Sequence, residues 1–200
     1  MNYYIDFDHT LFDTYEFKKE IVKILEKNGL DESYLKTDTD KPQLFNIRKL
    51  FENISVKTKT PLEKLIQELE ELFERLNELV YEDSIEFLKY LKSKNHKLHI
   101  LTWGDKEFQK EKVTASKLDK YFDEIIYAEE LKYTLDIDYA NGIFIDDSIR
   151  DLTGLYNAKA KQVFRIKRKN GKDSLQELGI KEILEFDSLK ELQKYLEKQN

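Results

Sequence analysis

Short apolar runs alternate along the chain with longer segments in which apolar positions recur every three or four residues. A short continuous run is typical of a strand buried on both faces, whereas the longer spacing is typical of an amphipathic helix. The short runs predict strands at residues 3–5, 97–103, 124–127, 143–145 and 162–166. The helical spacing predicts helices at residues 15–28, 42–53, 61–80, 85–94, 106–121, 149–157 and 188–198.

The order of these elements predicts the fold class. Strands that alternate with helices form a parallel sheet covered by helices on both faces. Each helix carries the chain back to the end of the sheet where the preceding strand began, so the next strand runs parallel to it. We therefore expect an α/β fold with a doubly wound parallel sheet. One segment interrupts the alternation, since only helices are predicted between the first strand and residue 82. We interpret residues 15–81 as an inserted, all-helical cap, and residues 1–14 and 82–200 as the α/β core.

Composition and charge narrow the possible functions. The 40% apolar share of the 200 residues is enough for a packed core, and the net charge of −6 gives no support to a nucleic-acid partner. The absence of cysteine excludes a disulfide scaffold, a thiol nucleophile and a zinc–thiolate site. No stretch approaches ~18 consecutive apolar residues, and the N-terminus lacks the pattern of a signal peptide. We expect a soluble, cytoplasmic protein without a membrane partner.

Polar residues follow three of the predicted strands directly. Asp6 and Asp8 follow the first strand, Thr102 lies at the end of the second, and Asp146 and Asp147 follow the apolar run 143–145. In open α/β sheets ligands bind at the carboxyl ends of the strands. Four carboxylates at one edge would repel one another without a cation, and an all-oxygen donor set favours Mg²⁺ over zinc.

The Asp-x-Asp pattern is weak evidence by itself, because it occurs three times. The pairs are Asp6/Asp8, Asp38/Asp40 and Asp136/Asp138. Only the first follows an apolar strand and precedes a threonine, Thr10. Two acids there could simply cap a turn. The coincidence of acids and a hydroxyl at three strand ends, in this order, favours a functional site.

These motifs resemble those of the haloacid dehalogenase-like (HAD) hydrolase superfamily, in the usual order. Residues 6–13 (DFDHTLFD) resemble its first motif, residues 101–104 (LTWG) its second, and residues 143–151 (IFIDDSIRD) its fourth. The third motif is a single lysine, for which Lys132 is the candidate. The resemblance covers residues 1–14 and about 82–168, implies a Rossmann-like core, and extends to the cap only in its position and helicity.

The resemblance implies hydrolysis of phosphomonoesters through an aspartyl-phosphate. Asp6 would be the nucleophile, and Asp8 would protonate the leaving alkoxide and then deprotonate the attacking water. For this, the pKa of Asp8 should be raised by burial or by neighbouring charge. Asp8 also argues against a dehalogenase, because the dehalogenases of this family lack an acid at this position and a departing halide needs no proton.

The resemblance also implies a metal site and a phosphate site. Mg²⁺ would be held by Asp6, the backbone carbonyl of Asp8, Asp147, and Asp146 directly or through water. The phosphoryl oxygens would be bound by Lys132, Thr102, Thr10 and backbone N–H groups near Gly104. Asp151 would orient the lysine or a metal-bound water, or is a surface acid in the first turn of a helix.

The sequence departs from the family pattern at two points. His9 stands where the family commonly has glycine, so the backbone of that loop could differ. Lys132 lies only fourteen positions before Asp146, a shorter interval than in many relatives, and Lys117 or Lys120 remain alternatives.

Other functions remain open at this stage. We expect a small phosphorylated metabolite, a nucleotide or a sugar phosphate, as the substrate. The alternatives are a phosphomutase on the same scaffold, a non-catalytic phosphate-binding or regulatory protein, and a receiver-like phosphoacceptor domain, which would lack the helical insert. The chain is expected to be a monomer or a weak dimer, in which the apolar positions between Leu62 and Leu79 could contact a second copy.

Overall fold

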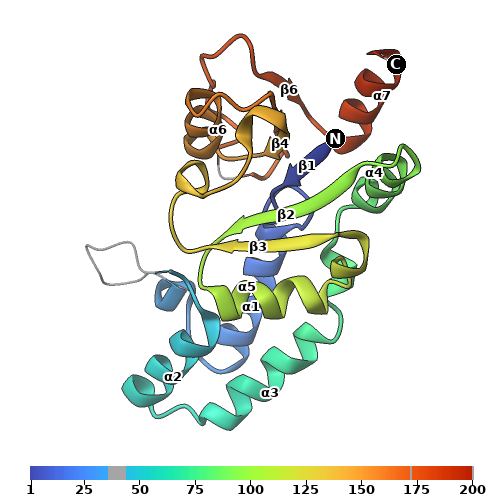
Figure 1. Cartoon of the computed structure of the whole chain (residues 1–200). Coiled ribbons are helices and arrows are strands. Elements are labelled where there is room, and N and C mark those ends of the chain that lie inside the picture. The colour runs from blue at the N-terminus through green and yellow to red at the C-terminus, as the bar shows by residue number, and fades with distance from the viewer. Residues whose placement is uncertain (36–43, 172, 200) are drawn as a thin grey trace.

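The computed structural model describes residues 1–35, 44–171 and 173–199 (Figure 1). In these residues six parallel strands form one sheet in the order β3-β2-β1-β4-β5-β6. They are β1 (Asn2–Ile5), β2 (Lys97–Trp103), β3 (Glu124–Ala128), β4 (Gly142–Asp146), β5 (Gln162–Ile166) and β6 (Leu184–Phe186). The predicted α/β class is therefore confirmed. The sequence pattern does not predict β6, because it has three residues of which two are exposed.

Helices cover both faces of the sheet. They are α1 (Thr14–Lys27), α2 (Ile47–Thr58), α3 (Leu62–Phe73), α4 (Glu82–Ser93), α5 (Lys106–Ala115), α6 (Ile149–Asn157) and α7 (Leu189–Gln199). On one face Ile5 belongs to the same core cluster as Leu91 of α4 and Leu192 of α7. On the other face Tyr4 shares a cluster with Leu152 of α6. Since neighbouring residues of β1 point to opposite faces, both faces are apolar, as expected for a parallel sheet.

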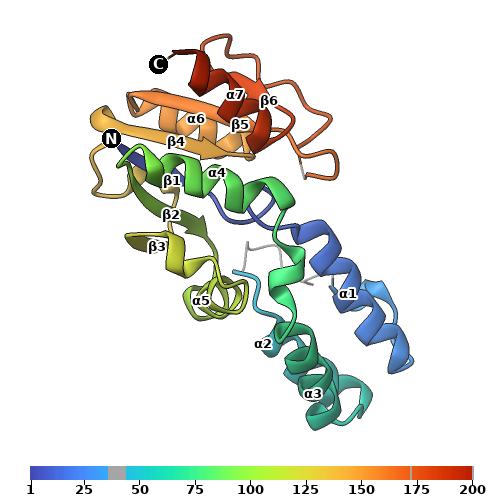
Figure 2. The same ribbon diagram turned by 90° about the vertical axis from the view of Figure 1, so that its right-hand side faces the viewer.

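Among the described residues, all the named elements between β1 and α4 are helices or 3₁₀ turns. This segment contains α1, the 3₁₀ turn η1 (Glu32–Leu35), α2, α3 and the 3₁₀ turn η2 (Leu76–Leu79). The three longer helices extend away from the sheet (Figure 2), and α3 packs against both α1 and α2. Their inner faces are apolar and join the main core, through Phe17 of α1, Phe51 of α2 and Leu69 of α3.

Three predicted helices differ from the observed ones by five residues or more at one or both ends. The one predicted at 42–53 spans Ile47–Thr58, and Pro42 lies outside the described residues. The one predicted at 61–80 ends at Phe73, and η2 follows. There the N–H of Asp13 donates to the carbonyl of Leu79 at 2.8 Å, which ties the chain to the loop after β1. The one predicted at 106–121 ends at Ala115, because Lys117 has a left-handed backbone (φ 59°).

Three more 3₁₀ turns lie in the connections between β2 and β4, one before β3 and two after it. They are η3 (Asp119–Tyr121), η4 (Lys132–Thr134) and η5 (Tyr139–Asn141). Among residues 1–35, 44–171 and 173–199, none of the helices combines the length and the apolar character that crossing a bilayer requires.

Candidate active site

The carboxyl ends of the central strands bring the predicted acids together. β1 pairs with β4 so that Ile5 lies opposite Ile145, and the N–H of Asp6 donates to the carbonyl of Ile145 at 2.8 Å. This register places Asp6 beside Asp146, the last residue of β4. The proximity of two residues 140 positions apart is therefore a direct consequence of parallel pairing.

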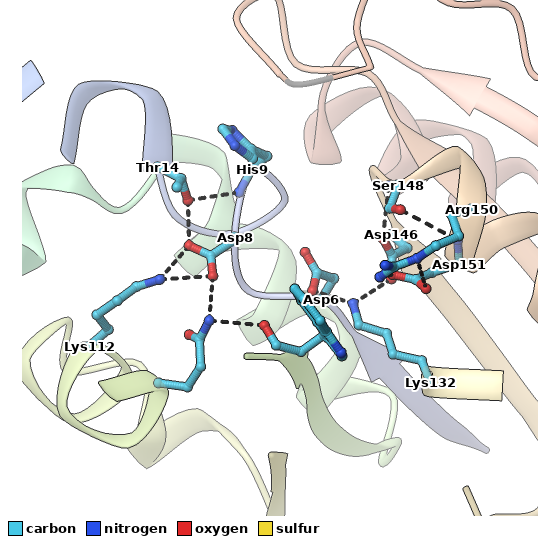
Figure 3. A network of polar contacts seen from close by, with 12 residues as sticks. Asp6, Asp8, His9, Thr14, Lys112, Lys132, Asp146, Ser148, Arg150 and Asp151 are labelled. Atoms are coloured by element: carbon cyan, nitrogen blue, oxygen red, sulfur yellow. Dashed lines mark hydrogen bonds and ion pairs between the residues drawn. The ribbon is translucent and has the colours of Figure 1, made fainter. Parts of the chain in front are cut away.

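Lys132 lies between these two acids. Its Nζ is 2.5 Å from Oδ1 of Asp6 and 2.7 Å from Oδ2 of Asp146 (Figure 3). The lysine side chain is buried, and it reaches the sheet edge from η4, in the short connection between β3 and β4. The alternative Lys120 instead lies over the ring of Tyr121, 5.3 Å from its centroid.

A third carboxylate completes this cluster. Oxygen atoms of Asp6, Asp146 and Asp147 all lie within 4.8 Å of one another. We call these three acids with Lys132 the Asp6 centre. Burial lowers the pKa of Lys132, but the carboxylates of Asp146 and Asp6 outweigh it and the pKa is raised, so the lysine is charged. One ammonium group thus faces three carboxyl groups.

The charge balance of the Asp6 centre fits a divalent cation. Burial raises the pKa of all three carboxyls, and Lys132 opposes this without outweighing it. For Asp147 the neighbouring Asp146 adds to the effect of burial, and the pKa is raised to about 8. Such a group of buried oxygen donors, short of positive charge, suits Mg²⁺. The side chain of Asp8 is not part of the group, so its expected contribution through the backbone carbonyl stays a prediction.

Asp8 points toward α5 instead. Nζ of Lys112 donates to its two carboxylate oxygens at 2.6 and 2.8 Å, Gln109 donates at 2.9 Å, and the Thr14 hydroxyl donates at 2.5 Å. We call these four residues the Asp8 centre. Figure 3 shows the two centres on opposite sides of the loop that follows β1.

The expected direction of the Asp8 pKa is wrong. Burial raises this pKa, but the ion pair and hydrogen bond from Lys112, with the hydrogen bonds from Thr14 and Gln109, outweigh burial and lower it to about 2. The physical reason is a full positive charge in direct contact with the carboxylate, which stabilises its ionised form. Asp8 is therefore an ionised group in this structure.

Sequence analysis missed Lys112, Gln109 and Thr14. Lys112 is buried, and its Nζ lies 5.3 to 5.9 Å from the centroids of four phenylalanine rings, those of Phe7, Phe12, Phe17 and Phe108. One signal was available, because Lys112 follows Phe108 by four positions and must share its helix face. Only the tertiary structure shows that this face is buried.

Two predicted phosphate ligands have hydroxyl groups without a partner. Oγ1 of Thr10 and Oγ1 of Thr102 are buried and make no hydrogen bond in the described residues. Buried hydroxyls normally have partners, so these two are suited to a ligand. Gly104, unlike these two threonines, is among the residues that line the cavity described below, but its N–H already donates to the carbonyl of Ala128 at 3.0 Å. Its φ of 150° and the side chain of Gln109, 2.7 Å from where a Cβ would stand, explain why glycine is needed there.

His9 takes the backbone conformation for which glycine is usual. Its φ is 60°, in the left-handed region, which costs a residue with a Cβ about 1–2 kcal/mol. The N–H of His9 donates to the carbonyl of Phe12 at 2.9 Å, which holds the loop in place. The side chain is buried and lines the cavity, and its Nδ1 has no partner in the described residues. Histidine therefore preserves the loop geometry and adds an imidazole to the site.

Asp151 is buried behind the Asp6 centre. Arg150 donates to both of its carboxylate oxygens at 3.0 Å, and the guanidinium of Arg150 lies 5.0 Å from the ring centroid of Trp103. This arrangement differs from the surface acid that was the alternative for Asp151. The pair Asp136/Asp138 does not join the site, since Asp138 caps η5. Asp38 and Asp40 lie outside the described residues.

Both centres open into one cavity of about 800 Å³. Its lining includes Asp6, Asp8, Lys132, Asp146 and Asp147 from the core. The opposite wall comes partly from α1 and from the segment before α2. A space of this size, with a charged end, fits a small anionic ester.

Comparisons with known proteins agree with this fold. The haloacid dehalogenase-like hydrolase family model matches residues 4–166. No curated protein matches the chain. Several solved structures superpose over nearly all of the chain, and three of them are as follows. A protein of Burkholderia xenovorans LB400 described as haloacid dehalogenase-like has a TM-score of 0.79 and 16% identity, over 98% of this chain and 96% of that one. A HAD phosphatase from Thermococcus onnurineus has a TM-score of 0.62 and 21% identity over 98% and 97%, and the L-2-haloacid dehalogenase from Xanthobacter autotrophicus has a TM-score of 0.61 and 16% identity over 100% and 99%. At these identities the likeness shows the fold alone.

Proposed function

Because the chain belongs to the haloacid dehalogenase-like hydrolase family, we propose that it is a Mg²⁺-dependent phosphomonoester hydrolase that acts through an aspartyl-phosphate on a small phosphorylated metabolite. The observation that carries this proposal is the excess of negative charge at the Asp6 centre, where three carboxyls face one lysine. A carboxylate that attacks a negatively charged phosphoryl group needs positive charge beside it, which a bound cation supplies. Attack on the halogen-bearing carbon of a 2-haloacid brings no phosphoryl oxygens against the carboxylate, so it has no such requirement.

The reaction takes two displacements at phosphorus. First, a carboxylate oxygen of Asp6 bonds to phosphorus while the bond to the ester oxygen breaks, and that oxygen departs with the electron pair. Second, water attacks the phosphorus of the aspartyl-phosphate and loses a proton, and phosphate leaves as the Asp6 carboxylate is restored. Asp6 suits the role of nucleophile because it lies at the strand edge, lines the cavity and is held by Lys132.

Other side chains of the Asp6 centre bind charge. Asp6, Asp147 and the backbone carbonyl of Asp8 would hold Mg²⁺, with Asp146 binding it directly or through water, and the ion would offset the repulsion between Asp6 and the phosphoryl oxygens. Lys132 stabilises charge on the transferring phosphoryl group. The unpartnered hydroxyls of Thr10 and Thr102 would donate to its oxygens.

Asp8 is the residue that transfers protons in the two steps. Because it is ionised, it can accept the proton of the attacking water in the second step. Its other role, protonation of the leaving alkoxide, requires that the Asp8 carboxyl first separate from Lys112. Residues 15–81 act as a cap that closes over the site and excludes water, because α1 and Phe45 form a wall of the cavity.

Hydrolysis of p-nitrophenyl phosphate tests the proposal. We expect turnover with Mg²⁺, loss of turnover with EDTA, and loss of turnover in Asp6→Asn with the fold retained by circular dichroism. Asp136→Asn is the matched control, because this exposed aspartate begins another Asp-x-Asp pair outside the site. Retained turnover in Asp6→Asn would overturn the assignment of the nucleophile.

Two further measurements separate the alternatives. Release of chloride from 2-chloropropionate, without turnover of the phosphate ester, would indicate a dehalogenase. Transfer of the phosphoryl group to a sugar hydroxyl in preference to water would indicate a phosphomutase. Failure of beryllium fluoride to bind to Asp6, in a folded protein without turnover, would indicate a non-catalytic role.

A further inference from the structure

We propose that the leaving group of the substrate is apolar, a hydrocarbon ring or chain carrying one phosphate, rather than a sugar or a nucleotide. This inference rests on the proposed function and specifies its substrate class. The cavity lining combines the charged residues of the Asp6 and Asp8 centres with a group of apolar side chains, the apolar wall, on which the rest of the substrate would lie. The ammonium group of Lys112 lies beside two rings of this wall, Phe17 and Phe108, and is paired with Asp8.

Aromatic and aliphatic side chains form this wall. Phe17 and Ile21 come from α1, Leu35 from the end of η1, Phe45 from the segment before α2, and Phe108 from α5. The rings pack on one another: the centroid of Phe108 is 5.8 Å from that of Phe45, edge to face, and 6.3 Å from that of Phe17. An apolar group placed here leaves water for an apolar surface, which is favourable in proportion to the area covered.

Most polar side chains of the cavity are already bonded to one another. Gln109 and Lys112 donate to Asp8, and Arg150 donates to Asp151. Among the described lining residues, the buried atoms without a partner are Nδ1 of His9 and Oε1 of Gln109. A sugar brings several hydroxyl groups, and each one buried without a partner costs about 1–3 kcal/mol. The wall therefore selects against a sugar phosphate.

The charge of the cavity argues against a second phosphate. Among the described residues that line the cavity, six carry a carboxyl group and four carry a cationic group. The carboxyls are those of Asp6, Asp8, Asp146, Asp147, Asp151 and Asp173, and the cations are Lys18, Lys112, Lys132 and Arg150. Three of these cations are engaged with aspartates. A nucleotide or a bisphosphate would bring its additional polar groups or charge to a wall that offers them few partners.

A matched pair of esters tests the inference. Cyclohexylmethyl phosphate and glucose 6-phosphate are both phosphates of a primary alcohol on a six-membered ring, and differ mainly in ring oxygen and hydroxyl groups. We expect kcat/KM with Mg²⁺ to be at least about tenfold higher for cyclohexylmethyl phosphate, because apolar contacts of this size discriminate by that order. Equal values, or a preference for glucose 6-phosphate, would overturn the inference.

Substitution of one residue of the apolar wall tests whether this wall causes the preference for the apolar ester. Phe45→Asn should lower the ratio of the two kcat/KM values by about fivefold to tenfold, whereas Phe45→Leu should largely keep it. Val56→Asn is the matched control, since Val56 is an exposed residue of α2 outside the cavity lining. If Phe45→Asn and Val56→Asn give the same ratio, this wall does not select the leaving group.

A binding measurement distinguishes failure of the inference from failure of the proposed function. Trp103 is the single tryptophan and lines the cavity, so its fluorescence reports occupancy. With Mg²⁺, cyclohexylmethylphosphonate should bind at least about tenfold more tightly than methylphosphonate. If no ester is hydrolysed, this result would still support the apolar wall while the proposed function fails. Equal affinity of the two phosphonates would overturn the inference itself.

Discussion

Two aspartates that follow β1, Asp6 and Asp8, differ in how much positive charge is available to balance them. In the Asp6 centre, Lys132 contacts Asp6 and Asp146 while Asp147 lies close by, so one positive charge faces three acids. In the Asp8 centre, Lys112 faces Asp8 alone, with Thr14 and Gln109 as additional donors. Both lysines are buried. The difference therefore lies in the number of carboxyls that each lysine has to balance.

This difference separates a centre that lacks positive charge from one whose charges already balance. A buried group of carboxyls with too little positive charge is unstable by itself and favours a cation or a proton. A buried carboxylate with one lysine and two hydrogen-bond donors is satisfied, and it fixes the geometry of the groups it joins. We propose that the Asp6 centre binds metal and phosphate, while the Asp8 centre connects the loop after β1 to α1 and α5 and keeps Asp8, the proposed proton-transfer group, ionised. Breaking each centre should have a different effect.

The largest effect on stability should come from Lys112→Met. It leaves the Asp8 carboxylate with little compensation, and breaking a buried pair in this way costs about 3–5 kcal/mol. Urea unfolding measures this loss. The double variant Asp8→Asn/Lys112→Met should recover a large part of it, and Lys110→Met, an exposed lysine of the same helix, is the control. A Lys112→Met protein as stable as Lys110→Met would show that the pair contributes nothing to folding.

Of the two buried lysines, Lys132 should have the larger effect on the reaction when it is replaced by methionine. Loss of a positive charge at the transferring phosphoryl group should reduce kcat on p-nitrophenyl phosphate by about 10²–10³-fold. Lys120→Met serves as the control, since Lys120 is exposed and was the alternative for this role. If Lys120→Met loses activity and Lys132→Met keeps it, the assignment of the two lysines is reversed.

The two centres should respond to pH in opposite directions. The pKa of Asp8 is lowered to about 2, so its contribution to stability is present above about pH 4 and is lost as the pH falls toward 2. A shift of this size corresponds to about 2 kcal/mol. The pKa of Asp147 is raised to about 8, so its contribution is present below about pH 4 and is lost as the pH rises through 8.

Unfolding by urea in metal-free buffer across this pH range measures both slopes. The stability difference between the wild type and Asp8→Asn/Lys112→Met should shrink toward pH 2, and Asp147→Asn should reduce the decline toward pH 8. The same slope in all three proteins would show that neither centre controls the pH dependence.

The smallest expected effect is stabilisation by Mg²⁺. At ten times its dissociation constant, an ion that binds only the folded state adds about 1.4 kcal/mol. For a protein of this size that raises Tm by roughly 3–6 °C. Asp147→Asn should abolish the rise, whereas Asp8→Asn should retain part of it because only its backbone carbonyl is a predicted ligand. An equal rise in Asp147→Asn would place the ion elsewhere.

Local pattern was sufficient for much of the core. The strands at 97–103 and 162–166 and the helix at 149–157 match their predicted limits, because each combines a regular period with clear polar boundaries. The proximity of Asp6, Asp146 and Asp147 also followed from the sequence, since parallel strands of one sheet bring their carboxyl ends to one edge. The motif resemblance then pointed to the same residues.

The electrostatic state of Asp8 could be decided only by the tertiary structure. Sequence predicted a raised pKa, because burial alone has that effect, yet Lys112 lies 104 positions away and reverses it. Likewise, nothing local indicates that Phe17, Phe45 and Phe108 form one wall of the cavity. The pattern of apolar and polar residues along a chain indicates which apolar positions are buried in strands and helices and which polar residues follow the strand ends. Which side chains meet across the fold depends on how the helices pack on the sheet, and those contacts set the charge and polarity of the site.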